Sequence, residues 1–401
     1  QAAGSMSRAA GEEESSSAVE VQSGEVANGV PPPPVPVGDS SRGLWSPVAL
    51  AEQAQKLQIA QRDPELLAAA LQVLRQWHQR FPASVWARIV KTGCDTASRH
   101  MPRVLKELNE VAPIIRKVQQ WLADLPADSP PAAIVDLCSG FGYLGMFLAE
   151  LIDDPARVGQ IILVDRGWPN PHIGSAGSIS SEHVYNHGTW RIPMLTIKTD
   201  IKDHKNIHSL VERVVAYEDR PCIICAVHLC GTLSLRAAQV FNTTARAHAL
   251  ALVPCCMPPK SHAKKEAVYR LGKAELIAAD LRNSSVLPTA QARFKAWVDY
   301  VTDTLDVGSL GEVGVEEISV SRASRHVGKS ECYAQDLHIF ARRQAWDNSH
   351  LPNLSEELAQ AGGPVVAEAR WYKPPKRQVH PPADEGGAVE EPREIAAALQ
   401  M

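Results

Sequence analysis

The sequence predicts an α/β fold built around a parallel sheet, and three observations support this. Short apolar runs, each long enough for a buried strand, recur between Ala132 and Pro254. Helical stretches separate several of these runs, as the right-handed crossovers of a parallel sheet require. The first run passes through a glycine-rich turn directly into a helix. In folds of this kind a ligand binds beside the carboxyl ends of the strands.

The glycine-rich turn is the stretch around which the other elements are predicted to assemble. Ala132 to Leu137 is a short apolar run, and Tyr143 to Leu151 returns to apolar residues at helical spacing. Between them, Gly140, Gly142 and Gly145 fit the pattern G-x-G-x-x-G. The pattern alone is common, but a strand before it and a helix after it predict a nucleotide-binding Rossmann unit.

Composition divides the chain into four parts. Residues 1–43 are rich in Ser, Glu, Gly and Pro and predict a disordered tail, and the residues before Met6 are typical of a cloning scar. Residues 44–125 have helical periodicity, residues 132–343 carry the strand–helix alternation, and residues 344–401 are polar and predict a flexible tail. We therefore expect a helical N-terminal cap packed on one α/β domain.

Two strong helices are predicted in the N-terminal cap. Asp63-Pro64-Glu65 combines an N-cap residue with Pro at the first helical position. A second helix is expected from Met101 to Leu122, with a kink at Pro113. The tryptophans of this region are expected to anchor the core: Trp77, Trp86 and Trp121.

Further apolar runs predict the rest of the sheet. They are Gln160 to Asp165, Met194 to Asp200, Cys222 to His228 and Ala247 to Pro254. Val313 to Ser321 and Gln335 to Ala341 are expected to pair as a long antiparallel hairpin. Two long insertions are expected to leave the carboxyl ends of strands, where such segments are usually functional. The first is Arg166 to Arg191, and the second, Met257 to Leu287, is predicted to continue as a basic helix.

Three acidic residues stand in or after predicted strands, at positions suited to a nucleoside. Asp136 lies in the first strand, Asp165 ends the next and Asp200 ends the third. A carboxylate suits the two ribose hydroxyls because it offers two acceptor oxygens and no competing donor. NAD and S-adenosylmethionine both satisfy this pattern, and the terminal hairpin favours S-adenosylmethionine.

The order of strands, the acidic strand ends and the final hairpin resemble a class I S-adenosylmethionine-dependent methyltransferase over about Met101 to Arg343. Four blocks are similar to one branch of that superfamily, which includes the eukaryotic tRNA acceptor-stem 2′-O-methyltransferases and related methyltransferase-like proteins. The blocks are Asp136 to Gly142, Asp200 to Asp203, His228 to Gly231 and Pro254 to Cys256. The resemblance implies a Rossmann-like sheet with a terminal antiparallel hairpin, and S-adenosylmethionine as the cofactor.

The resemblance also implies which residues contact the cofactor. Asp136 and the glycines would flank its methionine part, Asp165 its ribose and Asp200 its adenine, with His228 beside the methyl group. Cys138 stands where many methyltransferases carry the first glycine of the motif, which an extended backbone would tolerate. The full set is Asp136, Leu137, Cys138, Ser139, Gly140, Gly142, Gly145, Asp165, Arg166, Asp200, Ile201, His228 and Leu229.

Candidates for catalysis follow the fourth and fifth strands. His228 is a candidate general base, because an imidazole titrates near neutral pH, and a structural histidine is the alternative. Cys255 and Cys256 are candidates for a nucleophile in base methylation, although a buried wall is the favoured interpretation. A zinc site made by His228, Cys230, Cys255 and Cys256 is the less favoured alternative, and no metal is predicted. The sequence has no Asn-Pro-Pro-Tyr tetrad and no recognisable zinc finger around Cys94.

The net charge of -4 gives no overall signal for nucleic acid, but basic residues cluster locally. Lys260 to Lys273 and Arg322 to Lys329 are predicted to edge the cofactor face and contact RNA, with a solvated helix face and hairpin tip as the alternative. Arg370 to Arg377 is a candidate for stacking on single-stranded RNA or for docking a partner. The Pro-rich tails are a further candidate for a protein partner.

No apolar run is long enough to span a membrane. The 8 cysteines lack the spacing of a small disulfide framework, which favours a reducing compartment. We expect an intracellular protein, cytoplasmic or nuclear, with an organelle left open. The predicted function is S-adenosylmethionine-dependent methylation of RNA. Two alternatives are a catalytically degenerate methyltransferase fold serving as an RNA- or protein-binding assembly factor, and a small-molecule methyltransferase.

Overall fold

The structure is a computed structural model. It describes residues 45–91, 101–170, 177–203, 205–216, 218–318, 337–344, 346, 351–360 and 366–367. Several predictions fall outside these residues: the N-terminal tail, most of the C-terminal tail, the basic segments 322–329 and 370–377, and Cys94. They stay predictions.

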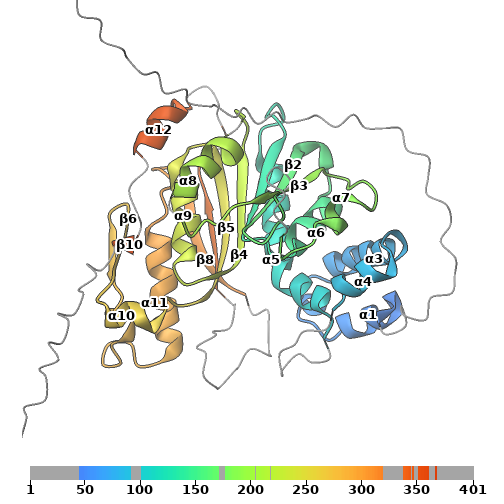
Figure 1. Ribbon diagram of the computed structural model, residues 1–401, viewed down its shortest axis with the longest axis horizontal. Coiled ribbons are helices and arrows are strands. Elements are labelled where there is room, and N and C mark those ends of the chain that lie inside the picture. Colours follow the sequence, from blue (N-terminus) through green and yellow to red (C-terminus); the bar gives the residue numbers. More distant parts are fainter. Residues whose placement is uncertain are drawn as a thin grey trace, which may run out of the picture. The chain divides into compact units, whose positions relative to one another are not determined.

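The centre of the fold is a seven-stranded sheet with the order β3-β2-β1-β4-β5-β9-β8 (Figure 1). Its strands are β1 (Ala132–Leu137), β2 (Val158–Asp165), β3 (Met194–Lys198), β4 (Cys222–Cys230), β5 (Ala247–Cys256), β8 (Glu312–Glu317) and β9 (Leu337–Arg342). Strands β1 to β5 pair in parallel, whereas β9 runs antiparallel to both of its neighbours, β5 and β8. The predicted parallel sheet and its terminal hairpin are thus confirmed.

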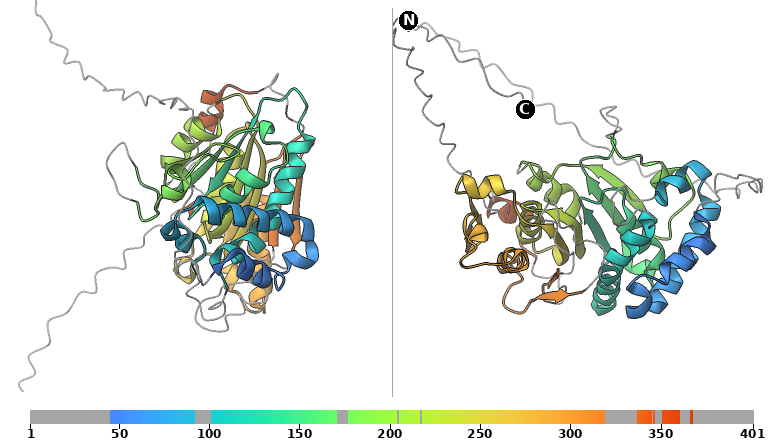
Figure 2. Two further views of the ribbon diagram at one scale, coloured as in Figure 1. Left: turned by 90° about the vertical axis from the view of Figure 1, so that its right-hand side faces the viewer. Right: turned by 90° about the horizontal axis from the view of Figure 1, so that it is seen from below.

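Both faces of the sheet are buried at its central strands, which explains why these strands are nearly continuous apolar runs. Successive side chains of a strand point to opposite faces. Ile134 therefore joins the core beneath α3 (Pro64–Arg80), α5 (Arg103–Asp124) and α6 (Tyr143–Leu151), whereas Val135 joins the core beneath α8 (Lys205–Leu210), α9 (Leu233–Thr243) and α11 (Ala290–Asp303). Figure 2 shows the two layers on either side of the sheet.

The predicted N-terminal cap is helical, and its helices pack on α5 and α6. It contains α1 (Pro47–Ala54), α2 (Ile59–Arg62), α3 and α4 (Ala83–Ile89). Asp63 caps α3 by accepting a hydrogen bond from the Leu66 backbone N–H at 3.0 Å, and it also accepts one from Arg116 of α5 at 2.8 Å. The hydrogen bond from Arg116 lowers the pKa of Asp63.

The remaining expectations for this cap are met in part. The three tryptophans are buried, as predicted. Helix α5 continues through Pro113 without a break. Among the described residues, no helix combines the length and the apolar character that crossing a bilayer needs.

The predicted basic helix within residues 257–287 is wrong. Only α10 (Lys260–Lys264) is helical there, followed by β6 (Val268–Leu271), β7 (Ala274–Ile277) and the 3-10 turn Asp280–Arg282. Strands β6 and β7 form an antiparallel hairpin, to which β10 (Val366–Ala367) adds a third strand. Gly272 lies in the turn of this hairpin with φ +60, a conformation that favours glycine. A glycine between two short, partly apolar segments was the sequence signal for a hairpin that the prediction of a helix missed.

Three short elements complete the described fold. Helix α8 passes into the π-helical turn Val211–Val215, and α7 (Glu182–Tyr185) lies within the first insertion. Helix α12 (Leu354–Gln360) follows the sheet. Its Glu357 accepts a hydrogen bond from the Ala245 backbone N–H at 2.7 Å, which holds α12 beside the start of β5.

Helix α6 approaches the sheet closely at Gly145. A Cβ added there would lie 2.3 Å from Leu163 Cδ2 and 3.3 Å from Ile161 Cγ2, both buried in β2. We expect Gly145→Ala to lower the free energy of unfolding by about 1–2 kcal/mol, because a crowded core must shift to accept the methyl group. Urea denaturation measures this change.

The matched control is Gly314→Ala in β8, where an added Cβ meets nothing within 4 Å. Its effect should stay within about 0.5 kcal/mol. A gain of stability in Gly145→Ala, from the higher helix propensity of alanine, would show that the close approach is not a constraint.

Candidate active site

Several residues near the carboxyl ends of the strands have a left-handed backbone conformation. Among the described residues, the non-glycine positions with positive φ are Cys138 at 57°, His228 at 61° and Glu266 at 50°. Two of these three belong to the predicted cofactor set, and Gly140 and Gly142 lie in the same left-handed region. Such a conformation costs an L-residue about 1–2 kcal/mol. Strain of this kind persists where the surroundings enforce it, which is typical of functional sites.

The extended backbone that would tolerate Cys138 in place of a glycine is not found. This residue follows β1 in the left-handed region, so the cysteine occupies a position that a glycine would occupy without strain. Burial raises the pKa of its thiol to about 12, with a contribution from Asp165. The side chain is therefore a neutral thiol and not a nucleophile.

The carboxylate of Asp165 holds the glycine turn in place. It accepts hydrogen bonds from the backbone N–H groups of Gly140 at 3.1 Å and Gly167 at 2.7 Å. One oxygen takes each of these bonds, so both oxygens keep a lone pair that can meet a diol. A Cβ added at Gly140 would meet nothing within 4 Å, so the turn borders open space on that side.

Asp136 is the buried member of the set. It is 2% exposed, and its Oδ2 has no hydrogen-bond partner. Burial raises the pKa of this carboxyl to about 8, and the charges of Asp165 and Glu107 add to the shift. A buried carboxyl with a bare oxygen is costly unless a ligand satisfies it. The arrangement suits a cationic group such as the amine of an amino acid.

The other predicted cofactor residues lie around this turn or after the neighbouring strands. Ser139 accepts a hydrogen bond from the indole of Trp168 at 3.1 Å. Arg166 and Asp200 form an exposed ion pair at 3.9 Å. Asp200 lies two residues beyond the end of β3. The apolar members of the set are buried: Leu137, Ile201 and Leu229.

His228 is held by two carboxylates of α5 that the sequence analysis missed. Its Nε2 lies 3.2 Å from Glu110 and 3.5 Å from Glu107, and both acids are buried. Burial disfavours the charged ring, but the two carboxylates outweigh it and raise the pKa of His228 to about 9. The ring is therefore charged at neutral pH, whereas the general-base role expected from the sequence requires a neutral ring. Glu107 and Glu110 lie among the apolar positions of α5, and acids at such positions could have indicated a buried partner of positive charge.

Part of the first insertion packs directly on the glycine turn. His183 of α7 stacks on Phe141 with ring centroids 3.9 Å apart, and its Nε2–H donates to the Phe141 carbonyl at 2.8 Å. Burial lowers the pKa of His183 to about 4, so this ring is neutral. The insertion thus supports the turn, and nothing in the sequence pattern indicated this contact.

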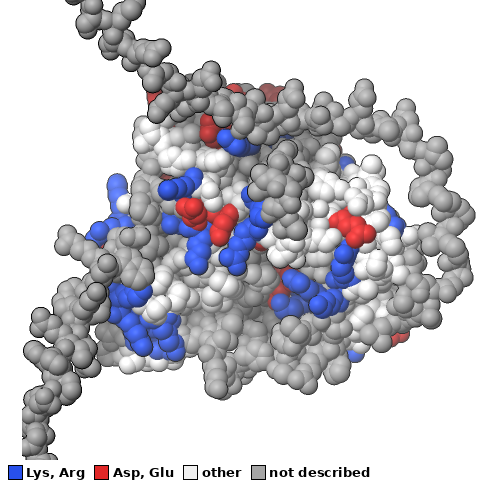
Figure 3. Space-filling view, in the orientation of Figure 1, with Lys and Arg blue, Asp and Glu red and all other residues white. Residues whose placement is uncertain are grey.

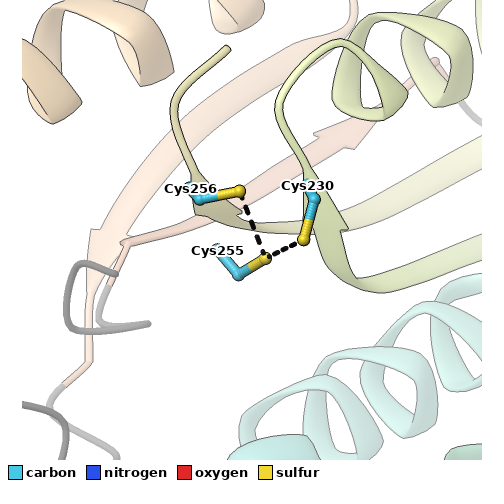
Figure 4. A group of neighbouring side chains, drawn as sticks. All are labelled: Cys230, Cys255 and Cys256. Carbon is cyan, nitrogen blue, oxygen red and sulfur yellow. Dashed lines mark hydrogen bonds between the residues drawn. The ribbon is translucent and has the colours of Figure 1, made fainter. Parts of the chain in front are cut away.

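The cysteines at the ends of β4 and β5 form a group of their own. The sulfur of Cys255 lies 3.0 Å from that of Cys230 and 4.0 Å from that of Cys256 (Figure 4). Hydrogen bonding to Cys230 raises the pKa of Cys255 and raises that of Cys256 to about 11, which makes both poor nucleophiles. The side chain of His228 points to α5 and not to the cysteines, so the four residues considered for a zinc site do not come together.

Comparison with known proteins gives one match to a family. Residues 105–259 match the family described as "Methyltransferase domain". The matched segment begins inside α5 and therefore includes Glu107 and Glu110. The search of curated proteins found no relative that matches.

Three solved structures are similar at a low level. The first is a cyclopropane-fatty-acyl-phospholipid synthase-like protein from Lactobacillus casei, with 12% identity and a TM-score of 0.29 over 57% of this chain and 75% of that chain. The second is the CurJ carbon methyltransferase, with 12% identity and a TM-score of 0.32 over 74% of this chain and 71% of that chain. The third is human N-acetylserotonin methyltransferase in complex with S-adenosylmethionine, with 9% identity and a TM-score of 0.23 over 75% of this chain and 72% of that chain. With TM-scores this low, none of the three contributes to the assignment.

The family match makes residues 105–259 a methyltransferase domain whose cofactor is S-adenosylmethionine, and the sheet order and the glycine turn agree with this assignment. The cofactor supplies an electrophilic methyl group. The described residues fit it: Asp136 would offer a bare buried oxygen to its amine, Gly140 would leave space for it, and Asp165 would have lone pairs available for its ribose. No methyl acceptor follows from the family match.

The strain at Cys138 predicts an unusual order of stabilities. Replacement by glycine normally destabilises a protein relative to alanine by about 0.5–1 kcal/mol. At φ 57 the order should reverse, with Cys138→Gly more stable than Cys138→Ala by about 1 kcal/mol, because only glycine escapes the left-handed penalty. Both variants lose the thiol, so their difference in denaturant midpoint isolates the backbone. An alanine variant of equal or higher stability would contradict the strain.

The buried carboxyl of Asp136 predicts a stability that falls as pH rises. Between its ordinary pKa of 3.8 and its folded pKa of about 8, the folded chain holds a proton that the unfolded chain has released. Raising the pH through this window therefore favours unfolding. Asp136→Asn cannot titrate, so its stability relative to the parent should rise across the same window in urea denaturation.

Added S-adenosylmethionine should weaken this pH dependence in the parent, since an ammonium group beside Asp136 favours the carboxylate. A constant difference between Asp136→Asn and the parent over the whole window would show that the carboxyl is ionised in the folded chain.

Proposed function

We propose that the protein methylates RNA. The observation that carries the proposal is an exposed basic surface that begins four residues after the end of β5. Its members, which we call the α10–β7 basic surface, are Lys260, Lys264, Lys265, Arg270 and Lys273. All five are exposed on the insertion between β5 and α11.

The position of this surface supports an RNA acceptor. Strand β5 ends at Cys256, and only the linker before α10 separates that strand end from the first lysine. Figure 3 shows Lys and Arg side chains gathered where Figure 1 places α10. Arg270 is paired with Glu275 of β7, so the lysines carry most of the excess positive charge of this surface. Lysine and arginine neutralise phosphates, and a local basic rim on a chain of net charge -4 is the pattern expected for a polyanionic partner.

The resemblance to the tRNA acceptor-stem branch supports the same acceptor class. Within the proposal, His228 lies beside the acceptor group and is positioned by Glu107 and Glu110. Cys255 and Cys256 form part of the wall at the ends of the strands. The cofactor contacts are those of the glycine turn, Asp136 and Asp165.

The direct test is transfer of a tritiated methyl group from S-adenosylmethionine to cellular RNA, protein and small-molecule fractions. We expect the label in RNA. A variant with Lys264→Glu and Lys273→Glu should bind RNA about tenfold more weakly and lose part of its salt dependence, because two phosphate contacts are lost. Filter binding at several salt concentrations measures both effects.

The control is Lys56→Glu, which makes a single Lys-to-Glu change at an exposed lysine of the N-terminal cap. It should leave RNA affinity within twofold. Label confined to protein or to small molecules would overturn the RNA proposal, as would equal RNA affinity in the double variant and the control.

A further inference from the structure

Three thiols meet at the carboxyl ends of β4 and β5. The ligand atoms of Cys230, Cys255 and Cys256 all lie within 4.8 Å of one another. We call this group the thiol cluster. Zinc–thiolate bonds of about 2.3 Å place two sulfurs of a tetrahedral site about 3.8 Å apart. The sulfur separations of 3.0 Å (Cys230–Cys255) and 4.0 Å (Cys255–Cys256) lie on either side of that value, so small side-chain rotations would fit a zinc ion.

The backbone brings these sulfurs together by an irregularity of the ladder. Consecutive residues of a regular strand point to opposite faces, so the thiols of Cys255 and Cys256 would normally diverge. The β4–β5 pairing changes register between Leu229 and Cys230, and Cys230 then pairs with Cys256. The Gly231 backbone N–H donates to the Cys256 carbonyl at 3.1 Å, which ties the two strand ends together beyond the last pair. The cluster is thus set by the sheet and does not depend on a flexible loop.

The cluster is accessible and incomplete as a tetrahedral site. Cys230 is exposed, and the other two cysteines are partly buried. Within the described part of the chain, no fourth histidine, cysteine or carboxylate joins the group. His228, only two residues before Cys230, is taken by Glu107 and Glu110. Three protein ligands with one position left open are typical of reactive zinc sites, whereas structural sites are closed by four.

We propose that the thiol cluster binds a zinc ion through three thiolates and leaves its fourth coordination position to solvent or to an exogenous ligand. Binding releases the thiol protons to solvent and forms zinc–sulfur bonds without any change of oxidation state. A disulfide would need an oxidant and would use only two of the three thiols. The proposal is independent of the methyl acceptor.

The test uses the full chain, purified under reducing conditions, loaded with zinc chloride and dialysed against metal-free buffer. Mass spectrometry of the metal content should find a single zinc per chain. Each of the variants Cys230→Ser, Cys255→Ser and Cys256→Ser should lose it. The control Cys222→Ala removes a thiol at the opposite end of β4 and should keep the zinc. Circular dichroism separates loss of a ligand from loss of the fold.

Two measurements on the unmodified chain keep the proposal testable if a variant fails to fold. Cobalt substitution should give the thiolate-to-cobalt charge-transfer absorption of a sulfur-rich tetrahedral site. Zinc should also protect Cys230 from alkylation by iodoacetamide. Zinc retained in all three serine variants would overturn the proposal, as would an absence of bound zinc in the reduced chain, or alkylation of Cys230 at an unchanged rate when zinc is present.

Discussion

The contact between α5 and the fourth strand is the interaction on which the candidate site depends. Glu107 and Glu110 reach His228 across more than a hundred residues of sequence and hold its ring near the carboxyl end of β4, where its backbone is left-handed. His228, Lys106 and Arg103 bring the pKa of Glu107 to about 2 against the opposing effect of burial. A buried ion pair of this kind adds little net stability, but loss of one partner leaves a buried charge that costs about 3–5 kcal/mol. Its role is therefore to fix a position.

Much of the fold could be predicted because local pattern and tertiary environment agree. The strands β1, β2, β4 and β5 are apolar runs buried on both faces, so the sequence signal is strong whichever face is considered. The helix predicted after β5 was wrong because the local pattern of that segment is weak. Its two strands have only four residues each, with one charged residue in each (Arg270 and Glu275), and a single glycine distinguishes the hairpin from a helix.

The candidate site was predictable only where its residues are contiguous. The glycine turn and Asp165 follow from spacing, because strand, turn and strand end are fixed by the Rossmann unit. The three thiols were considered together from the sequence, but as a set with His228, which turns to α5 instead. Two features depend on contacts between distant segments: the α5 carboxylates at His228 and the stacking of His183 on Phe141. Pairwise spacing carries no information on such contacts. The left-handed Cys138 was missed because the sequence shows a substitution of glycine but not the backbone angle that makes it costly.

The position of β9 has a consequence for how the chain is made. Strand β5 forms its outer ladder with β9, whose last residue follows that of β5 by more than eighty positions. During synthesis the apolar edge of β5 therefore stays unpaired until Arg342 has left the ribosome, and an unpaired apolar edge is a template for aggregation. Arg343 then holds β9 in place, because its guanidinium donates hydrogen bonds to the carbonyls of Ala247 at 2.8 Å and Phe241 at 3.0 Å. Nascent chains that stall before this arginine would depend on chaperones more than the finished protein does.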